Sequence, residues 1–160
     1  MEKLKPIKRS KELAPLSREH HDGLMLVWKI RRGIKKGIQL ERIGKYVQFF
    51  YQNSLRRHFE IEEEYVFLLL SQHNMERKEA EAQHLVLRRQ IEEMSDIAQL
   101  INACLIEFSD LLERHIRFEE RILFPLIEKE ADPVLFSTYG KMLIDEEVKG
   151  CAIYNDEFWL

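Results

Sequence analysis

Four segments of this 160-residue chain carry apolar residues at intervals of three and four, and each segment also places a histidine on its apolar stripe. Such spacing gives an amphipathic helix with one buried face. In the clearest case the stripe consists of Leu111, Leu112, Phe118, Ile122 and Leu126. His115 falls on the same face, and Glu119 follows it after one helical turn. A histidine and a carboxylate at this spacing are neighbours and can bind one cation together.

Helix-breaking and capping residues predict where these helices begin and end. Ser17 is a suitable N-cap for the first helix, and Gly37 is a suitable stop. Ser95 and Asp96 offer a break before the fourth helix, in which Pro125 should bend the chain or start the last turn. The expected helices cover about residues 17–36, 41–70, 76–94 and, after Asp96, a stripe that reaches residue 126. Asp132 and Pro133 predict the N-cap and first position of a fifth, short helix to about Val148.

The pattern indicates an all-α protein, because no segment shows a strand pattern or a solenoid repeat. Four long amphipathic helices with short connections predict an up-down-up-down antiparallel four-helix bundle, followed by the short fifth helix. The length suits one domain. We divide the chain into a basic leader at 1–15, the bundle at 16–131, and a C-terminal helix and tail packed on the bundle at 132–160. In the tail, Phe158 and Trp159 are expected to cover an apolar spot.

Charge, hydropathy and cysteine content narrow the function. The net charge of −3 argues against a general nucleic-acid binder. No run of about 18 uncharged apolar residues predicts a membrane span, and the basic N-terminus lacks the apolar run of a secretory signal. The two cysteines, Cys104 and Cys151, form no CxxC pair and no disulfide framework. We therefore expect a cytoplasmic protein without a nucleic-acid or membrane partner.

The stripe histidines are predicted to lie at one height in the bundle. In antiparallel helices of equal rise, two residues are level when the turn between them falls midway. For each successive pair of the stripe histidines, the midpoint falls within a few residues of a predicted turn. At a rise of about 1.5 Å per residue, long side chains can absorb that offset. One histidine from each helix therefore joins a single core layer, made of His20, His58, His84 and His115. Glu62 and Glu119 each lie one turn after a histidine of this layer.

Energetics favour a bound cation in this layer. Burying imidazoles and carboxylates without partners costs several kcal/mol per charged group, and a cation offsets that cost. Nitrogen and oxygen ligands suit divalent iron, zinc, copper or manganese. Six ligands overfill a tetrahedral zinc site and fit either one octahedral ion or two ions with bridging carboxylates. The predicted ligands are His20, His58, Glu62, His84, His115 and Glu119. Glu81 could add charge, whereas Glu63 and Glu120 are expected to face outward or to support the ligands.

Other candidates near the layer are less suitable as ligands. His20 and His21 compete for the first-helix position, and His20 fits the stripe better. His73 falls in a predicted turn and is expected to be solvated. Arg88 stands one turn after His84, so the third helix offers no second ligand there.

Four sequence blocks together resemble the hemerythrin-like, HHE cation-binding domains. The blocks are EHH at 19–21, HFEIEE at 58–63, a single histidine at 84, and HIRFEE at 115–120. The resemblance covers about residues 16–130. It implies an up-down bundle with a non-haem iron site, often di-iron with oxo, hydroxo and carboxylate bridges, and the six predicted ligands as its ligand set. Oxygen-carrying members have a second histidine where Arg88 stands here, so the resemblance points instead to members that sense oxygen or iron, handle reactive oxygen or nitrogen species, or repair iron–sulfur centres.

We therefore expect a metal-binding module rather than an enzyme. Its expected cofactor is a di-iron centre, with a single iron, manganese or zinc ion as alternatives. Its expected partners are the metal and a small exogenous ligand, namely oxygen, nitric oxide or peroxide. One alternative is a redox enzyme that reduces peroxide or oxygen at an open coordination position. Another is a metal-free or zinc-filled structural bundle.

Overall fold

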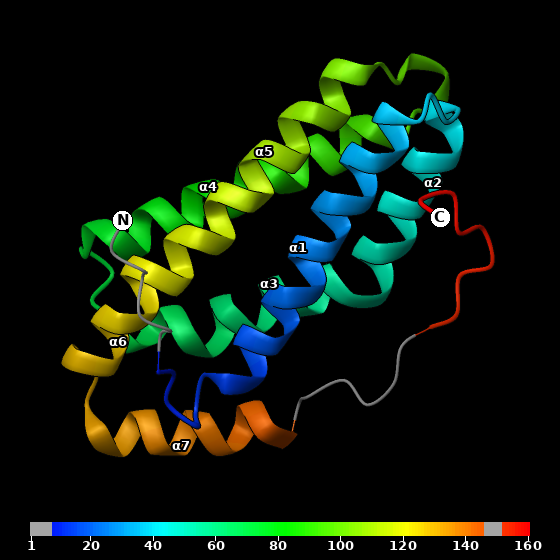
Figure 1. Cartoon of the computed structure of the whole chain (residues 1–160). Helices are drawn as coiled ribbons and strands as arrows, with labels where there is room; N and C mark the ends of the chain where they lie inside the picture. Colours follow the sequence, from blue (N-terminus) through cyan, green and yellow to red (C-terminus); the bar gives the residue numbers. More distant parts are fainter. Residues whose placement is uncertain (1–7, 146–151) are drawn as a thin grey trace, which may run out of the picture.

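Helices make up most of the described chain, which comprises residues 8–145 and 152–160 of a computed structural model (Figure 1). Four antiparallel helical columns form a bundle, and these residues include no strand. The columns are α1 (Ala14–Lys35), α2 (Leu40–Phe50) continued by α3 (Arg56–Ile61), α4 (Met75–Met94), and α5 (Asn102–Phe118) continued by α6 (Phe124–Glu130). Helix α7 (Pro133–Asp145) lies across one end of the bundle. The predicted all-α bundle with a short C-terminal helix is confirmed.

The apolar core consists of two parts, and the histidine layer lies between them. Residues that follow His20 in α1, such as Val27 and Ile30, belong to one part. Residues that precede it, such as Leu13 and Leu16, belong to the other. Close approach of the columns depends on a small residue, because a Cβ added at Gly23 would lie 2.7 Å from Cδ1 of Ile116 on α5.

Two of the columns contain π-helical turns where the sequence predicts continuous α-helix. The π turns are η1 (Tyr51–Leu55), η2 (Glu62–Val66) and η5 (Glu119–Leu123). In the last two, the N–H groups of Phe67 and Phe124 donate to the carbonyl oxygens of Glu62 and Glu119, five residues earlier. Pro125 follows η5 within the first turn of α6, where its missing N–H is tolerated. A short 3-10 turn, η3 (Phe67–Leu69), ends the second column.

The first helix begins earlier than predicted. Helix α1 begins at Ala14 rather than after Ser17, because Pro15 is compatible with a first helical turn. The hydroxyl of Ser17 donates instead to Oε1 of Glu120, at 2.7 Å. Leu13 is fully buried, so the described end of the predicted leader packs against the bundle.

The fourth column begins later than predicted. Asp96 caps no long helix; a 3-10 turn, η4 (Ile97–Gln99), follows it, and α5 begins at Asn102. The intervening residues cover the end of the core. Leu100 is buried, and a Cβ added at Gly44 on α2 would lie 2.6 Å from Cδ2 of Leu100.

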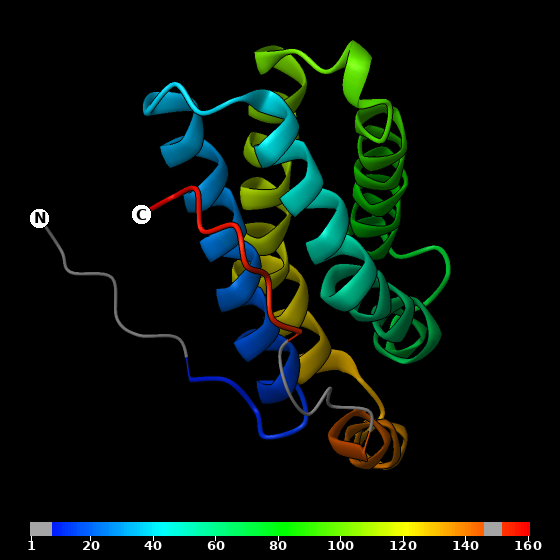
Figure 2. The ribbon, with the colours of Figure 1, turned by 90° about the vertical axis from the view of Figure 1, so that its right-hand side faces the viewer.

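The C-terminal residues add one helix and an extended tail. Asp132 caps α7 as predicted, because its Oδ1 accepts hydrogen bonds from the N–H groups of Val134 and Leu135, both at 3.0 Å. The predicted end of this helix near residue 148 lies outside the described residues. Residues 152–160 run along α1 and α2, and Phe158 is buried in the core (Figure 2). Among the described residues, no helix combines the length and the hydropathy needed to cross a bilayer.

Candidate metal centre

The six predicted ligands meet in one buried layer at the middle of the bundle. Each is at most 4% exposed: His20, His58, Glu62, His84, His115 and Glu119. The histidines come from α1, α3, α4 and α5, and the two glutamates are the first residues of the π turns η2 and η5. His21 and His73 are exposed and do not join the layer. The structure therefore places His20, rather than His21, beside the other candidates.

The donor atoms form two groups that share both glutamates. One group contains His20 and His58, the other contains His84 and His115, and in each group the donor atoms lie within 4.8 Å of one another. Oε1 of Glu62 lies 3.0 Å from Nε2 of His58 and 3.3 Å from Nε2 of His84.

Glu119 spans the two groups in the same way. Its Oε2 lies 3.1 Å from Nε2 of His20, and its Oε1 lies 2.7 Å from Nε2 of His115. Each carboxylate therefore lies within reach of both histidine pairs.

All the nitrogen and oxygen atoms that face the interior of the layer lack hydrogen-bond partners within the part of the chain that the structure describes. These atoms are the four histidine Nε2 atoms and the four carboxylate oxygens of Glu62 and Glu119. Buried polar atoms without partners are rare and costly in folded proteins. A cation accepts lone pairs from imidazole nitrogens and carboxylate oxygens together, so this donor set fits a metal ion.

An outer ring of hydrogen bonds orients the four imidazoles. The Nδ1 atoms of His20, His58, His84 and His115 lie 2.6, 2.6, 2.9 and 2.7 Å from side-chain oxygens of Glu120, Glu19, Glu63 and Gln83, respectively. A carboxylate or amide oxygen only accepts, so each Nδ1 carries the proton and donates. The Nε2 of each ring is then the nitrogen that faces the interior and is left to bind a metal.

Two arginines hold the outer ring in place. Arg88 donates to both oxygens of Glu63, at 2.7 and 2.8 Å, so it supports a ligand and offers none itself. Arg9 donates to Oε2 of Glu120 at 3.0 Å and to Oε1 of Glu128 at 2.6 Å. The Arg9 side chain is only 8% exposed. This residue, from the predicted leader, was not foreseen as part of the centre.

One predicted source of charge is wrong. Glu81 is exposed and pairs with Arg77, one turn earlier on α4, at 3.1 Å. It directly follows Ala80, which belongs to the buried stripe of α4, and its own side chain lies outside that stripe. It contributes no charge to the layer.

Sequence reasoning also missed Glu19 and Gln83 as outer-ring residues. Each directly precedes a ligand candidate but bonds to a histidine of a neighbouring column: Glu19 to His58 and Gln83 to His115. The two glutamates that directly follow ligand candidates, at 63 and 120, behave in the same way. A carboxylate or amide side chain adjacent in sequence to four of the six ligand candidates was therefore the available signal.

The electrostatics of the layer favour bound positive charge. Burial lowers the pKa of His84, but the carboxylates of Glu119, Glu62 and Glu63 outweigh it and raise that pKa to about 10. Burial raises the pKa of Glu119, but His115 and the other neighbours bring it well below its usual value. Glu119 therefore stays ionised and attracts cations.

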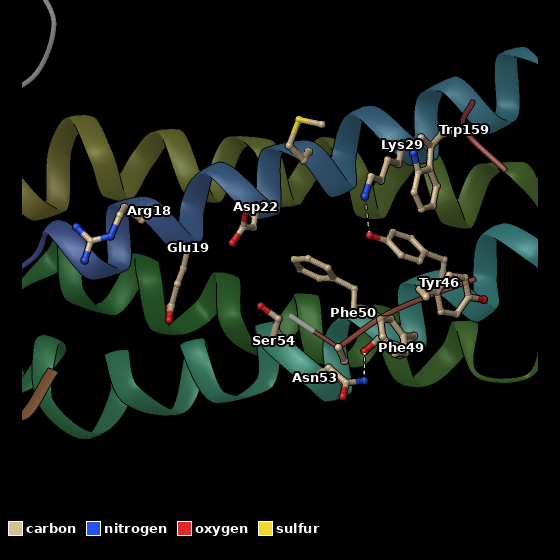
Figure 3. Close-up of a pocket in the computed structure, with 13 residues that line it drawn as sticks. Arg18, Glu19, Asp22, Lys29, Tyr46, Phe49, Phe50, Asn53, Ser54 and Trp159 are labelled. Atoms are coloured by element: carbon tan, nitrogen blue, oxygen red, sulfur yellow. Dashed lines mark hydrogen bonds between the residues drawn. The ribbon is translucent and has the colours of Figure 1, made fainter. Parts of the chain in front are cut away.

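A pocket of about 460 Å³ lies beside the layer, between α1, the second column and the C-terminal tail (Figure 3). Glu19 and Asp22 line it from α1, and Phe50 and Ser54 line it from the opposite column. Glu19 also bonds to His58, so the wall of the pocket is in direct contact with the layer. A pocket of this volume suits a small molecule.

A family model described as the hemerythrin HHE cation-binding domain matches residues 11–127. The match includes all six buried donors and the outer-ring residues from 19 to 120. Comparison with curated proteins and with solved structures found no match.

Proposed function

This chain belongs to the hemerythrin HHE cation-binding domain family, and from that premise we propose that it holds two iron ions in the buried layer and presents them to a small exogenous ligand, oxygen or nitric oxide. In this proposal His20 and His58 bind one ion, and His84 and His115 bind the other. Glu62 and Glu119 would offer carboxylate oxygens to both.

The observation that carries the proposal is the pairing of two donor groups through shared carboxylates. Each group offers two imidazole nitrogens and oxygens from both glutamates. Eight inward-facing atoms without hydrogen-bond partners among the described residues make this layer unfavourable as a metal-free core. This supports two cations rather than one, because a single ion within reach of one pair would leave the other pair unsatisfied.

Iron, unlike zinc, would keep coordination positions open with this donor set. Four nitrogen and oxygen donors complete a tetrahedral zinc site, whereas iron and manganese take up to six ligands and keep positions free. When bound, iron supplies those open positions for a small molecule together with one-electron redox chemistry.

The chain's own residues would control access and orientation. The outer-ring partners of the histidines, Glu120, Glu19, Glu63 and Gln83, keep each Nδ1 protonated and each Nε2 directed inward. Apolar residues on both sides of the layer exclude bulk water; Phe59 and Phe124, for example, are fully buried. The pocket beside Glu19 is the route by which we propose that a small molecule approaches.

The proposal is tested by loading the chain with Fe²⁺ under anaerobic conditions, removing unbound iron and recording the absorption spectrum as oxygen is admitted. We expect about two iron ions per chain and a near-ultraviolet band that develops with oxygen. One ion per chain would contradict the dinuclear centre. Iron content no higher than that of a chain lacking His58 and His115 would contradict the metal centre altogether.

A further inference from the structure

We propose that the two cation positions differ in affinity and that Gln83 sets the difference. The position at His20 and His58 holds its ion more tightly than the position at His84 and His115. The inference rests on the proposed function, because it requires two cations in the layer. It concerns the partners of the imidazoles rather than the ligands themselves.

The histidines of the first position are both held by carboxylates. Nδ1 of His20 lies 2.6 Å from Oε1 of Glu120, and Nδ1 of His58 lies 2.6 Å from Oε2 of Glu19. A carboxylate draws the Nδ1 proton toward itself more strongly than a neutral oxygen does, which increases the electron density on Nε2. Two negative charges behind the imidazoles also attract a cation directly.

The histidines of the second position have weaker partners. Nδ1 of His115 donates to the neutral amide oxygen of Gln83, at 2.7 Å. Nδ1 of His84 has a carboxylate partner, Glu63, but at the longer distance of 2.9 Å. Arg88 donates to the same Glu63 oxygen at 2.7 Å and so competes with His84 for it.

The Glu120 oxygen that faces His20 does not receive the same competing arginine hydrogen bond among the described residues. Arg9 contacts Oε2 of Glu120, whereas His20 uses Oε1, so the arginine and the imidazole bind different oxygens. The second donor to Oε1 is the neutral hydroxyl of Ser17, at 2.7 Å. The carboxylate facing His20 therefore keeps more of its negative charge on the oxygen that the imidazole contacts.

Unequal positions would give the chain a one-metal state. Outer partners of metal-bound histidines typically change metal affinity by about 10- to 100-fold. Over that interval of free metal concentration, the first position is filled and the second is not. Occupancy of the second position would then report the metal supply, and the bridging glutamates would serve one ion or two accordingly.

The test exchanges the side chains of Glu79 and Gln83, so that the carboxylate stands at position 83. Nε2 of Gln83 donates to Oε1 of Glu79 at 3.0 Å. The double variant Glu79→Gln/Gln83→Glu keeps the net charge and allows the same side-chain pair to hydrogen-bond, but it places a carboxylate against Nδ1 of His115. Glu79→Gln alone is the matched control, because Glu79 is exposed on the same helix.

The cobalt-loaded proteins are equilibrated with nitrilotriacetate buffers of decreasing free Co²⁺, and bound cobalt per chain is measured. For the unmodified chain we expect a plateau near one ion, with dissociation constants at least about 10-fold apart. The double variant should lower only the larger dissociation constant, that of the weaker position, by about 10-fold or more. The control should change neither dissociation constant. Glu19→Gln should raise the smaller dissociation constant and so narrow the range of free Co²⁺ over which one ion is bound.

The possible outcomes separate this inference from the proposed function. Loss of both ions in a single step, or an unchanged weaker constant in the double variant, would overturn the inference while leaving a dinuclear centre intact. A chain that binds no more than one cobalt ion at saturation would overturn the proposed function itself.

Discussion

At the scale of single residues, each histidine of the layer has one partner inside the layer and another outside it. His115 shows this most clearly, since its Nε2 faces Glu119 at 2.7 Å and its Nδ1 bonds to Gln83 at 2.7 Å. Replacing one of these histidines should therefore affect both the bound cation and the side chains that contact the histidine. This makes single substitutions informative about the whole layer.

We expect His115→Ala to lose at least one metal ion per chain and to lower stability. The substitution removes a nitrogen donor and leaves the fully buried carboxylate of Glu119 without its closest partner. Leaving a buried carboxylate without its partner typically costs roughly 3–5 kcal/mol. Metal analysis and thermal denaturation measure the two effects. His21→Ala, at an exposed position one residue after His20, is the control. A His115→Ala chain with full metal content would rule out His115 as a ligand.

The pH dependence of the metal-depleted protein is also set by individual residues. The pKa of His84 is raised from 6.5 to about 10, and that of His58 is raised well above 6.5 despite burial. A raised histidine pKa adds stability below the unfolded pKa and loses it as the pH rises toward the folded one. We therefore expect the Tm of the chelator-treated protein to fall between pH 6.5 and about 10.

Two comparisons check the origin of this pH effect. His84→Gln, which is neutral at every pH, should flatten the slope. In acid, the Tm of the metal-loaded protein should instead rise with increasing pH, because protons compete with the metal for Nε2. A Tm that stays constant or rises toward pH 10 in the metal-depleted protein would contradict the assignment of His84 as a buried imidazolium partner of the glutamates.

At the scale of the elements, the sequence predicts the helices well because apolar spacing is a local property. The height argument works for the same reason: a regular rise carries His20, His58, His84 and His115 to one level. The outer ring was not predicted, because it depends on side chains that cross between columns, as Glu19 does to reach His58. The π turns were missed, although each shifts the buried stripe by one residue: in η5, Leu123 is buried, whereas Ile122 of the predicted stripe is exposed.

The N-terminal segment is the element whose role the sequence concealed most. Its lysines and prolines suggest a solvated leader, yet Arg9 contacts Glu120 and Glu128, and the backbone N–H of Ser10 donates to Glu128 at 2.6 Å. Both glutamates lie on the fourth column. The segment thereby ties the first helix to the column that carries Glu119, directly behind His20.

We expect Arg9→Met to loosen this connection and to weaken metal retention at the His20 position. The methionine keeps much of the apolar stem but removes the charged hydrogen bonds to Glu120, which are typically worth about 1.5–3 kcal/mol each. Proteolysis of the N-terminal segment and the rate of metal loss to a chelator should both increase. Lys8→Met, at the exposed neighbouring position, is the control. Unchanged metal loss in Arg9→Met would limit Arg9 to a structural role.

At the scale of the whole molecule, the polar layer lies between two apolar core parts. Every column crosses the layer, so the layer contributes to the packing of all four. The glutamates that serve both histidine pairs come from the second and fourth columns, and the imidazoles come from all of them. A bound cation would therefore stabilise the bundle as a unit rather than one helix pair.

Removal of metal should for this reason lower the stability of the entire bundle in one cooperative transition. A ligand that binds only the folded state stabilises it by RT ln(1 + [L]/Kd), which is about 2.7 kcal/mol at one hundred times Kd for each ion. We expect chelation to lower the Tm by several degrees, and re-addition of Fe²⁺ under anaerobic conditions to restore it. Calorimetry measures both, and hydrogen exchange locates the effect. Faster exchange should appear in α1, α3, α4 and α5 together, since each contributes one histidine. Faster exchange confined to a single column would show that the cation is held locally and that the two core parts are stable without it.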